Sequence, residues 1–244
     1  MTDRARVWVM GLSFVPLAAF LIWGISGLNA FGFYPGPYGD IINAIGDWQR
    51  HAWNMATAVN FDYRGFDTMG EEYIMFVSVV GVALILRERE LEDKSSRTTL
   101  AESERADGVG VLSFVLLPIV VVFGIYMALH GPNTPGGGFQ GGAIVGTAFL
   151  FAYLGSGHKA FAAIGKTEVV EPLEALGALA YVGIGLVALF LGDEFLTNYL
   201  PLGTAGNLWS GGTIWAINIA VLLEIGTGFL LATGEFLKEI QPPE

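Results

Sequence analysis

Six long runs of apolar residues alternate with polar segments along this chain of 244 residues. A helix needs about 20 predominantly apolar residues to cross the hydrocarbon core of a bilayer, and each run is close to that length. The pattern predicts an all-α protein, a polytopic bundle of about six transmembrane helices at Val7–Leu28, Phe66–Leu86, Val109–His130, Phe139–Gly155, Pro172–Gly192 and Thr213–Gly234. We expect a multi-pass membrane protein, because a compact water-soluble fold could not bury so much apolar surface.

Basic residues predict how these helices are oriented. If the N-terminus is cytoplasmic, the inside segments hold ten Lys and Arg residues and the outside segments hold only Arg50 and Arg64. Cytoplasmic segments carry such an excess of Lys and Arg, so we expect both termini in the cytoplasm. The first run follows Arg4 and Arg6, as in a signal peptide. We interpret it as a retained signal anchor, because it is too long for a signal-peptide core and no cleavage pattern follows it.

The polar segments divide the chain into two membrane units. Residues 1–86 form an N-terminal two-helix unit, whose long outside loop contains a stretch, Ile41–Val59, suited to a helix lying at the membrane interface. Residues 87–108 are polar and mixed in charge, which is typical of a cytoplasmic linker. Residues 109–244 form a second unit of four spans with short connections.

Composition excludes several classes of function. The net charge of −11 argues against nucleic-acid binding, which needs a basic surface. A chain without cysteine has no disulfide, no thiolate zinc site and no cysteine-ligated iron–sulfur cluster. His51, His130 and His158 lie on different segments without metal-ligand spacing, and no G-x-S-x-G nucleophile motif is present. We therefore expect no metal, no cofactor and no self-contained enzyme.

Glu224 is the most informative single residue. It lies near the centre of the last run, where Asn218 is the only other strongly polar side chain between Ile214 and Leu231. An ionised acid at that depth costs roughly 3 kcal/mol on insertion scales, so Glu224 is expected to be protonated, paired or hydrated. Such a group is suited to taking up and releasing protons. The alternative is a structural acid that is hydrogen-bonded to a neighbouring helix.

Three further acids lie near the ends of predicted spans. Glu71 and Glu72 lie about one turn into the second span, and their side chains point roughly 100° apart on a helix. We expect one of them to face a protein interior or aqueous path and the other to face the interface. Glu174 lies at the inside start of the fifth span. In each case the alternative is an acid stabilised by the helix dipole without a role in transport.

A glycine-rich turn joins the third and fourth spans. Its prolines and glycines preclude a regular helix through residues 131–142. The glycines that continue into the fourth span would let another helix approach closely. His130 and Gln140 flank the turn, and His130 is either a proton-relay group or a polar cap at the membrane surface. The residues to which we assign a structural role in this turn are Pro135, Gly136, Gly137, Gly138 and Gln140.

With these residues considered together, the second unit resembles the MnhB component of Mrp-type multisubunit sodium/proton antiporters, also called MrpB. The resemblance depends chiefly on the turn Thr134–Gly142, with sequence TPGGGFQGG. It is supported by Leu173–Gly177 (LEALG) and Leu223–Gly228 (LEIGTG), and it covers roughly Val109–Glu239.

The first unit resembles the segment that ends the large A-type subunit of the same systems, and also the small E-type subunit of related membrane-bound hydrogenases. The motif is Phe61–Glu71 (FDYRGFDTMGE), which leads directly into a span, and the resemblance covers roughly Asn54–Leu86. Glu72 occupies a place where an apolar residue is expected. Two units that are usually encoded apart are therefore joined in this chain.

The resemblance implies a membrane subunit of a multisubunit monovalent cation (Na⁺)/proton antiporter, related to the membrane arm of complex I, in a prokaryotic cell membrane. Its expected partners are the other subunits of such an assembly, Na⁺, H⁺ and membrane lipids. By motif position, Glu71, Glu174 and Glu224 are the polar residues carried over. Two alternatives stay open: a structural subunit that never contacts the ion, and an accessory subunit of a respiratory or hydrogenase complex.

Overall fold

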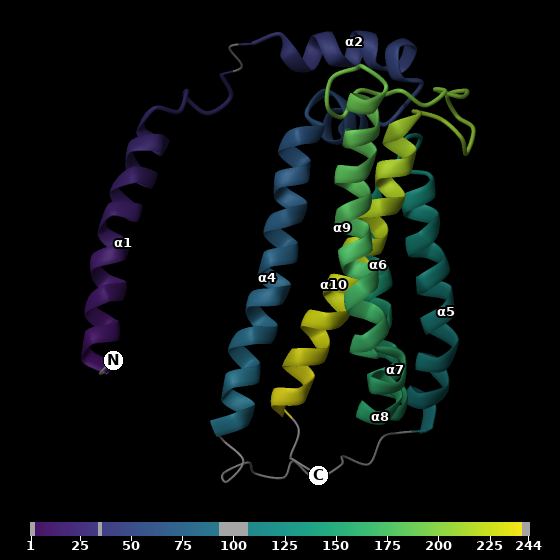
Figure 1. The fold of residues 1–244 in the computed structure, drawn as a ribbon. Helices are drawn as coiled ribbons and strands as arrows, with labels where there is room; N and C mark the ends of the chain where they lie inside the picture. Colours follow the sequence, from purple (N-terminus) through teal and green to yellow (C-terminus); the bar gives the residue numbers. More distant parts are fainter. Residues whose placement is uncertain (1–2, 34–35, 93–106, 241–244) are drawn as a thin grey trace. The chain divides into compact units, whose positions relative to one another are not determined.

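The computed structural model describes residues 3–33, 36–92 and 107–240, and the described chain is almost entirely helical (Figure 1). No strand occurs in these ranges, although Gly203 and Ser210 form an isolated antiparallel bridge. The helices are, in chain order, α1 (Asp3–Ser26), α2 (Tyr38–Arg50), α3 (Met55–Ala58), the π-helix η1 (Val59–Tyr63), α4 (Gly65–Glu92), α5 (Asp107–Leu129), α6 (Gly138–Ala148), α7 (Leu150–Ser156), α8 (His158–Ile164), α9 (Thr167–Phe190) and α10 (Thr213–Ile240).

The six predicted spans are confirmed. Six helical segments among the described residues are long and apolar enough to cross a membrane, and they match the six predicted runs. The fourth span consists of two helices, α6 and α7, separated at Phe149. The fifth begins at Thr167 instead of Pro172, because a proline this close to the start of a helix removes only one backbone hydrogen bond.

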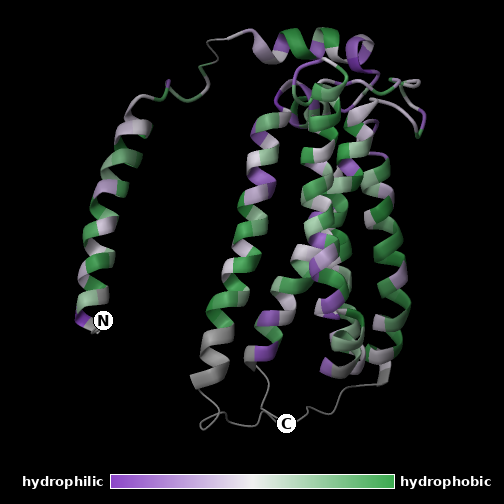
Figure 2. Cartoon of the chain, in the orientation of Figure 1, coloured by the Kyte–Doolittle hydropathy of each residue, from purple (hydrophilic) through white to green (hydrophobic). Residues whose placement is uncertain are grey.

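Apolar side chains cover the outer faces of the helices (Figure 2). Large exposed apolar residues occur on every membrane-length helix, including Phe114 on α5, Leu179 on α9 and Ile74 on α4. Lipid is the natural environment of such a surface, because water would penalise it. The chain is therefore a multi-pass membrane protein.

The contacts divide the chain into two compact units, Met1–Ile41 and Ile42–Glu244. In the first unit, the span of α1, Val7–Ser26, buries none of its residues. The predicted separation into units 1–86 and 109–244 concerns family resemblance and stays a prediction. The predicted linker lies mostly outside the described residues, although residues 87–92 continue α4 and residues 107–108 begin α5.

The predicted interfacial stretch, Ile41–Val59, is not one helix. Helix α2 begins earlier than predicted and ends at Arg50, and the chain breaks at His51, whose φ of 48° lies in the left-handed region. Two short helical segments, α3 and η1, then lead into α4. A left-handed residue cannot continue a right-handed helix, which accounts for the break.

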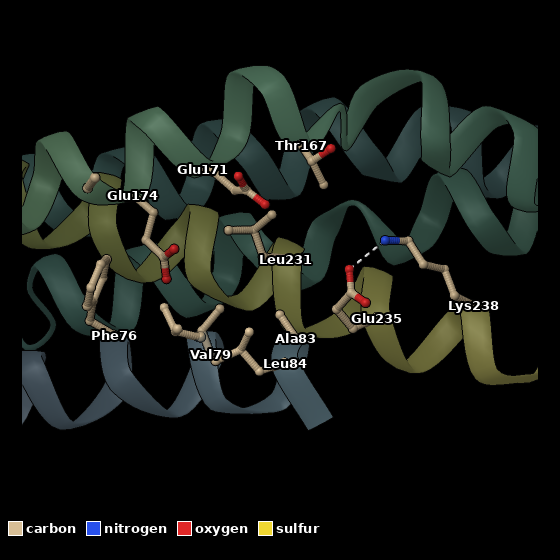
Figure 3. Close-up of a pocket in the computed structure, with 12 residues that line it drawn as sticks. Phe76, Val79, Ala83, Leu84, Thr167, Glu171, Glu174, Leu231, Glu235 and Lys238 are labelled. Atoms are coloured by element: carbon tan, nitrogen blue, oxygen red, sulfur yellow. Dashed lines mark hydrogen bonds and ion pairs between the residues drawn. The ribbon is translucent and has the colours of Figure 1, made fainter. Parts of the chain in front are cut away.

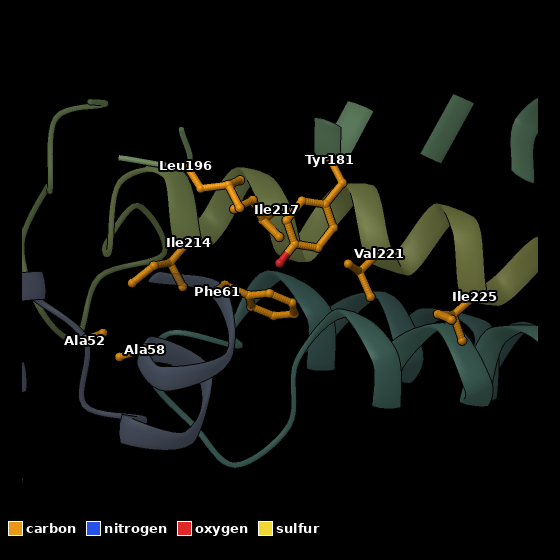
Figure 4. Packing of buried hydrophobic residues seen from close by; sticks show 9 residues of the cluster. All are labelled: Ala52, Ala58, Phe61, Tyr181, Leu196, Ile214, Ile217, Val221 and Ile225. Carbon is orange, nitrogen blue, oxygen red and sulfur yellow. The ribbon is translucent and has the colours of Figure 1, made fainter. Parts of the chain in front are cut away.

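Helix α10 is the centre of the second unit and contacts α4, α5, α6 and α9. Its apolar side chains pack with Phe61 and Tyr181 in the cluster of Figure 4. Glycines of α6 lie directly against its backbone: a Cβ on Gly138 would lie 2.4 Å from the carbonyl oxygen of Asn218, and one on Gly142 would lie 3.0 Å from the amide nitrogen of Gly226. This close approach confirms the predicted use of the glycines and fixes α10 against α6.

Candidate functional site

Three buried carboxyl groups lie where α4, α9 and α10 pack together. Glu72 of α4 is 2% exposed, Glu174 of α9 is 4% exposed and Glu224 of α10 is 2% exposed. Each helix contributes one acid. Glu72 and Glu174 are each close enough to Glu224 to interact with it electrostatically. An acid buried at membrane depth is costly unless it serves an ion or a proton, so the three together form the candidate site.

Glu224 lies in the middle of this group. At 1.5 Å per residue, it is about 16 Å from the start of α10, close to the middle of the span. Both of its carboxyl oxygens are buried and neither has a hydrogen-bond partner in the described ranges. A structural acid that is hydrogen-bonded to a neighbouring helix is therefore not what the packing of this chain provides.

The contact between α9 and α10 positions Glu174 beside Glu224. A Cβ on Gly177 of α9 would lie 2.5 Å from the amide nitrogen of Glu224, so the two backbones are in direct contact there. A Cβ on Gly228 would lie 3.0 Å from Glu174 Oε1 and 3.4 Å from Val79 Cγ2. Gly228 follows Glu224 by one helical turn, so the carboxyl of Glu174 lies one turn along α10 from Glu224. Its Oε1 is buried without a partner among the described residues.

Helix α4 presents Glu72 to the same space, whereas its neighbour Glu71 is exposed. The buried residues Thr68, Glu72 and Val79 recur at helical spacing and define the face of α4 that packs against α9 and α10. Glu72 Oε2 is buried without a hydrogen-bond partner in the part of the chain that the structure describes. Glu72, which the family motif leaves unassigned, is thus the buried member of the pair.

A cavity of about 540 Å³ opens beside Glu174, and we call it the Glu174 cavity (Figure 3). It lies between α4, α9 and α10, and the carboxyl of Glu174 points into it. Glu235 and Lys238 form an ion pair at its wall. The lining residues are Phe76, Val79, Val80, Ala83, Leu84, Thr167, Glu171, Glu174, Ala175, Leu231, Glu235 and Lys238.

A second cavity of about 250 Å³ includes Glu72 in its lining, and we call it the Glu72 cavity. It is formed by α3 and η1, the start of α4 and the glycine-rich turn. Its lining residues are Ala56, Thr57, Asn60, Phe61, Thr68, Glu71, Glu72, Gly136, Gly137, Phe139 and Gln140. The two cavities lie toward opposite ends of the bundle, because α4 runs from the Glu72 cavity toward the Glu174 cavity.

Two asparagines hold the glycine-rich turn in place beside the Glu72 cavity. Asn54 Nδ2 donates to the carbonyl oxygens of Gly131 and Thr134, at 2.8 Å in both cases. Asn218 Oδ1 accepts from the amide nitrogen of Gly138 at 2.6 Å, where α6 begins. Gly137, between them, has a φ of 153°, a value that favours glycine. The turn is therefore a fixed wall of the cavity.

The remaining predicted residues lie at the edge of this region. His130 packs against Tyr126, with ring centroids 4.3 Å apart, and is absent from the lining of both cavities. Pro135 is exposed at the tip of the turn, and Gln140 is an exposed wall residue of the Glu72 cavity. Their roles, like that of Glu71, stay predictions.

Sequence reasoning missed several residues that surround the acids. Tyr181 is fully buried and donates its hydroxyl to the carbonyl oxygen of Gly65 at 2.9 Å, joining α9 to the start of α4. Its spacing of two turns from Glu174 on one face of α9 could have indicated it. Glu171 and Glu235 were overlooked because the Glu174 cavity that they line depends on three helices packing together.

Unpaired carboxyl groups in a row can pass protons through intervening water or bind a cation. No group of three or more His, Asp or Glu side chains is placed to hold a metal ion within residues 3–33, 36–92 and 107–240. The chemistry available at this site is therefore protonation and the binding of weakly held ions.

Comparisons with known proteins agree with the helical membrane architecture. An uncharacterized protein of Methanocaldococcus jannaschii is 32% identical over 203 residues, which are 75% of this chain and 76% of that protein. The MnhB-type component of the Na⁺/H⁺ antiporter of Alkalihalophilus pseudofirmus is 33% identical over 88 residues, or 36% of this chain and 60% of that component. This chain therefore matches less than two thirds of that antiporter component.

A solved structure covers nearly the whole chain. A chain in the structure of the membrane-bound sulfane sulfur reductase, described as an archaeal respiratory membrane complex, matches with a TM-score of 0.67 and 30% identity. The match covers 96% of this chain and 98% of that chain. Relatives in bacteria and archaea agree with the predicted prokaryotic membrane location.

A family model described as a domain related to the MnhB subunit of Na⁺/H⁺ antiporters matches residues 109–231. That range includes the glycine-rich turn, Glu174 and Glu224, so the predicted resemblance of the second unit is confirmed. The chain belongs to the family of proteins that carry this MnhB-related domain.

Proposed function

We propose that this chain is a membrane subunit of a multisubunit cation/proton antiporter-like complex and that Glu72, Glu224 and Glu174 form its proton relay. The observation that carries the proposal is the row of three buried, unpaired carboxyls between two cavities. Membership of the MnhB-related family and the antiporter component among its relatives support the cation/proton part.

The relay uses the position of each acid along its helix. Glu72 is about 10 Å from the start of α4, and Glu174 is about 10 Å from the start of α9 at the opposite end of the bundle. Glu224, in the middle, interacts electrostatically with both. A proton received at one cavity would pass through Glu224 to the other. Glu71, exposed at the wall of the Glu72 cavity, would deliver protons or cations to Glu72.

Replacing Glu224 with Gln tests the relay, because the amide has nearly the same size but cannot carry a proton. In membrane vesicles containing the native complex, we expect E224Q to abolish cation-dependent proton exchange while the complex still purifies intact. E168Q is the matched control, since Glu168 is an exposed acid in the first turn of α9. Unchanged exchange in E224Q would leave the chain a structural role only.

A second candidate function is an accessory subunit of a respiratory membrane complex. It is favoured by the match to a chain of the sulfane sulfur reductase complex, which extends over almost the full length of both chains. Purification through a tag on this chain, followed by mass spectrometry, separates the two. Antiporter-like membrane subunits alone would support the first function, and soluble redox subunits in the same preparation would support the second.

A further inference from the structure

The Glu72 cavity differs from the Glu174 cavity in the groups that line it. Its wall is rich in oxygen-bearing side chains and in the unwound backbone of the glycine-rich turn. The side chains concerned are those of Thr57, Asn60, Thr68, Glu71, Glu72 and Gln140. The Glu174 cavity, by contrast, is walled mainly by aliphatic and aromatic groups around its acids.

Glu72 supplies one buried negative charge to this space. Its side chain is 2% exposed and its Oε2 has no hydrogen-bond partner among the described residues. A buried carboxylate needs a counter-charge or a proton, because an isolated ion is very costly in a low-dielectric interior. The ion pairs in this half of the bundle do not provide one, since Arg50 pairs with Asp62 and Arg64 with Asp67.

Neutral oxygen atoms lie around the same space. Thr57 donates its hydroxyl to the carbonyl oxygen of Gly136 at 3.2 Å, which leaves lone pairs of the hydroxyl oxygen available. Gln140 Oε1 lies 3.4 Å from the position that a Cβ on Gly137 would take, so it folds back over the turn. Non-helical backbone at membrane depth is tolerated where it lines a cavity, and unwound segments of this kind coordinate cations.

Size and charge indicate the kind of ion. A volume of about 250 Å³ would hold roughly eight water molecules at about 30 Å³ each, enough for a cation with part of its hydration shell. Oxygen ligands suit hard cations. One buried carboxylate balances a single positive charge, whereas a divalent ion commonly takes several carboxylate ligands.

We infer that the Glu72 cavity binds an alkali-metal cation, with the Glu72 carboxylate as the charged ligand and the Thr57, Thr68 and Gln140 oxygens as neutral ligands. The inference rests on the proposed function, because it makes the first acid of the relay the point where cation and proton compete. Binding at equilibrium can nevertheless be measured without any transport.

The test is saturable binding of radioactive sodium to the full chain, purified and reconstituted in lipid nanodiscs. We expect the unmodified protein to bind sodium, with displacement by unlabelled sodium or potassium chloride but not by choline chloride. E72Q should weaken the affinity at least tenfold. T68V, which replaces the hydroxyl with a methyl group of similar size, should weaken it several-fold. E168Q, on the exposed surface of α9, should stay within twofold.

The outcomes separate this inference from the proposed function. Absence of saturable sodium binding in the unmodified protein would overturn the cation site, as would equal binding in E72Q and E168Q when both elute as folded protein. T68V decides the matter if E72Q does not fold, and unchanged affinity in T68V would then count against the site. E174Q should retain sodium binding but lose proton exchange, so a failed relay with intact binding would refute only the proposed function.

Discussion

The closest contact between α9 and α10 can be tested by adding one methyl group to Gly177. A Cβ there would lie 2.5 Å from the amide nitrogen and 2.8 Å from the Cα of Glu224, and 2.8 Å from the carbonyl oxygen of Ala220. All three are backbone atoms and cannot rotate away. Ordinary contact begins near 3.4 Å, so G177A must push the two helices about 1 Å apart.

The energetic cost of that separation follows from two opposing effects. Overpacking a tight interior costs typically about 1–3 kcal/mol, and an immovable backbone favours the upper part of that range. Alanine in place of glycine returns up to about 1 kcal/mol through helix propensity. Gly183, also on α9, has nothing within 4 Å of its added Cβ, so G183A gains the second effect without the first. The difference between the two variants should be about 2–3 kcal/mol.

The assay is thermal unfolding of the purified protein in detergent, followed by loss of the folded peak on size-exclusion chromatography. At about 2–4 °C per kcal/mol for a chain of this length, G177A should unfold roughly 5–10 °C below G183A. Proton exchange should also fall in G177A, because Glu174 and Glu224 lie on the two separated helices. Equal midpoints for G177A and G183A would refute the packing argument.

Two further substitutions examine how the end of the bundle near the Glu72 cavity is held together. N218A removes the acceptor of the Gly138 amide, 2.6 Å away in a fully buried position, and should lower stability by about 1–2 kcal/mol, measured as the thermal midpoint; an unchanged midpoint would mean that the hydrogen bond is dispensable. D62A removes the partner of Arg50 (2.6 Å) and of Asn198 (2.9 Å) and should cost roughly 2 kcal/mol, seen as faster protease cleavage between α9 and α10 than in the exposed control D193A; equal cleavage rates would count against this role of Asp62.

The spans could be predicted because each is a local property of the sequence. An apolar run of membrane length specifies a helix whatever lies beside it, and the glycine-rich turn interrupts the helices where its prolines and glycines require. The same glycines predicted a close helix approach, which Gly138 and Gly142 make against α10. The partner helix could not be predicted, because it depends on contacts between residues far apart in the chain.

The choice between Glu71 and Glu72 shows why the site was harder to predict. The two residues point about 100° apart, so rotation of α4 about its axis decides which one is buried. That rotation is set by contacts of Val79 with α10 and of Tyr73 with the backbone of α9. A search for buried positions at helical spacing, through Thr68, Glu72 and Val79, would have favoured Glu72 from the sequence itself.

The cavities lay further beyond reach of the sequence. Each is bounded by segments that are distant in the chain, so neither has a local signal. Lys238 illustrates this, because its sequence position indicates only a cytoplasmic end, whereas its ion pair with Glu235 lines the Glu174 cavity. Fold prediction depended on local composition, and site prediction required the mutual rotation of three helices.

The central position of α10 has a consequence for biosynthesis. Its carboxyl at Glu224 is shielded only after α4, α6 and α9 have packed around it, yet the helix must first enter the bilayer. Insertion of an acid at the centre costs about 3 kcal/mol, whereas each Leu, Ile, Val or Phe returns about 0.3–0.6 kcal/mol. Ten such residues between Ile214 and Leu231 together offset that cost. The translocon can therefore release α10 into lipid unaided, and a packing defect would yield an inserted chain with an exposed acid, recognisable to membrane proteases.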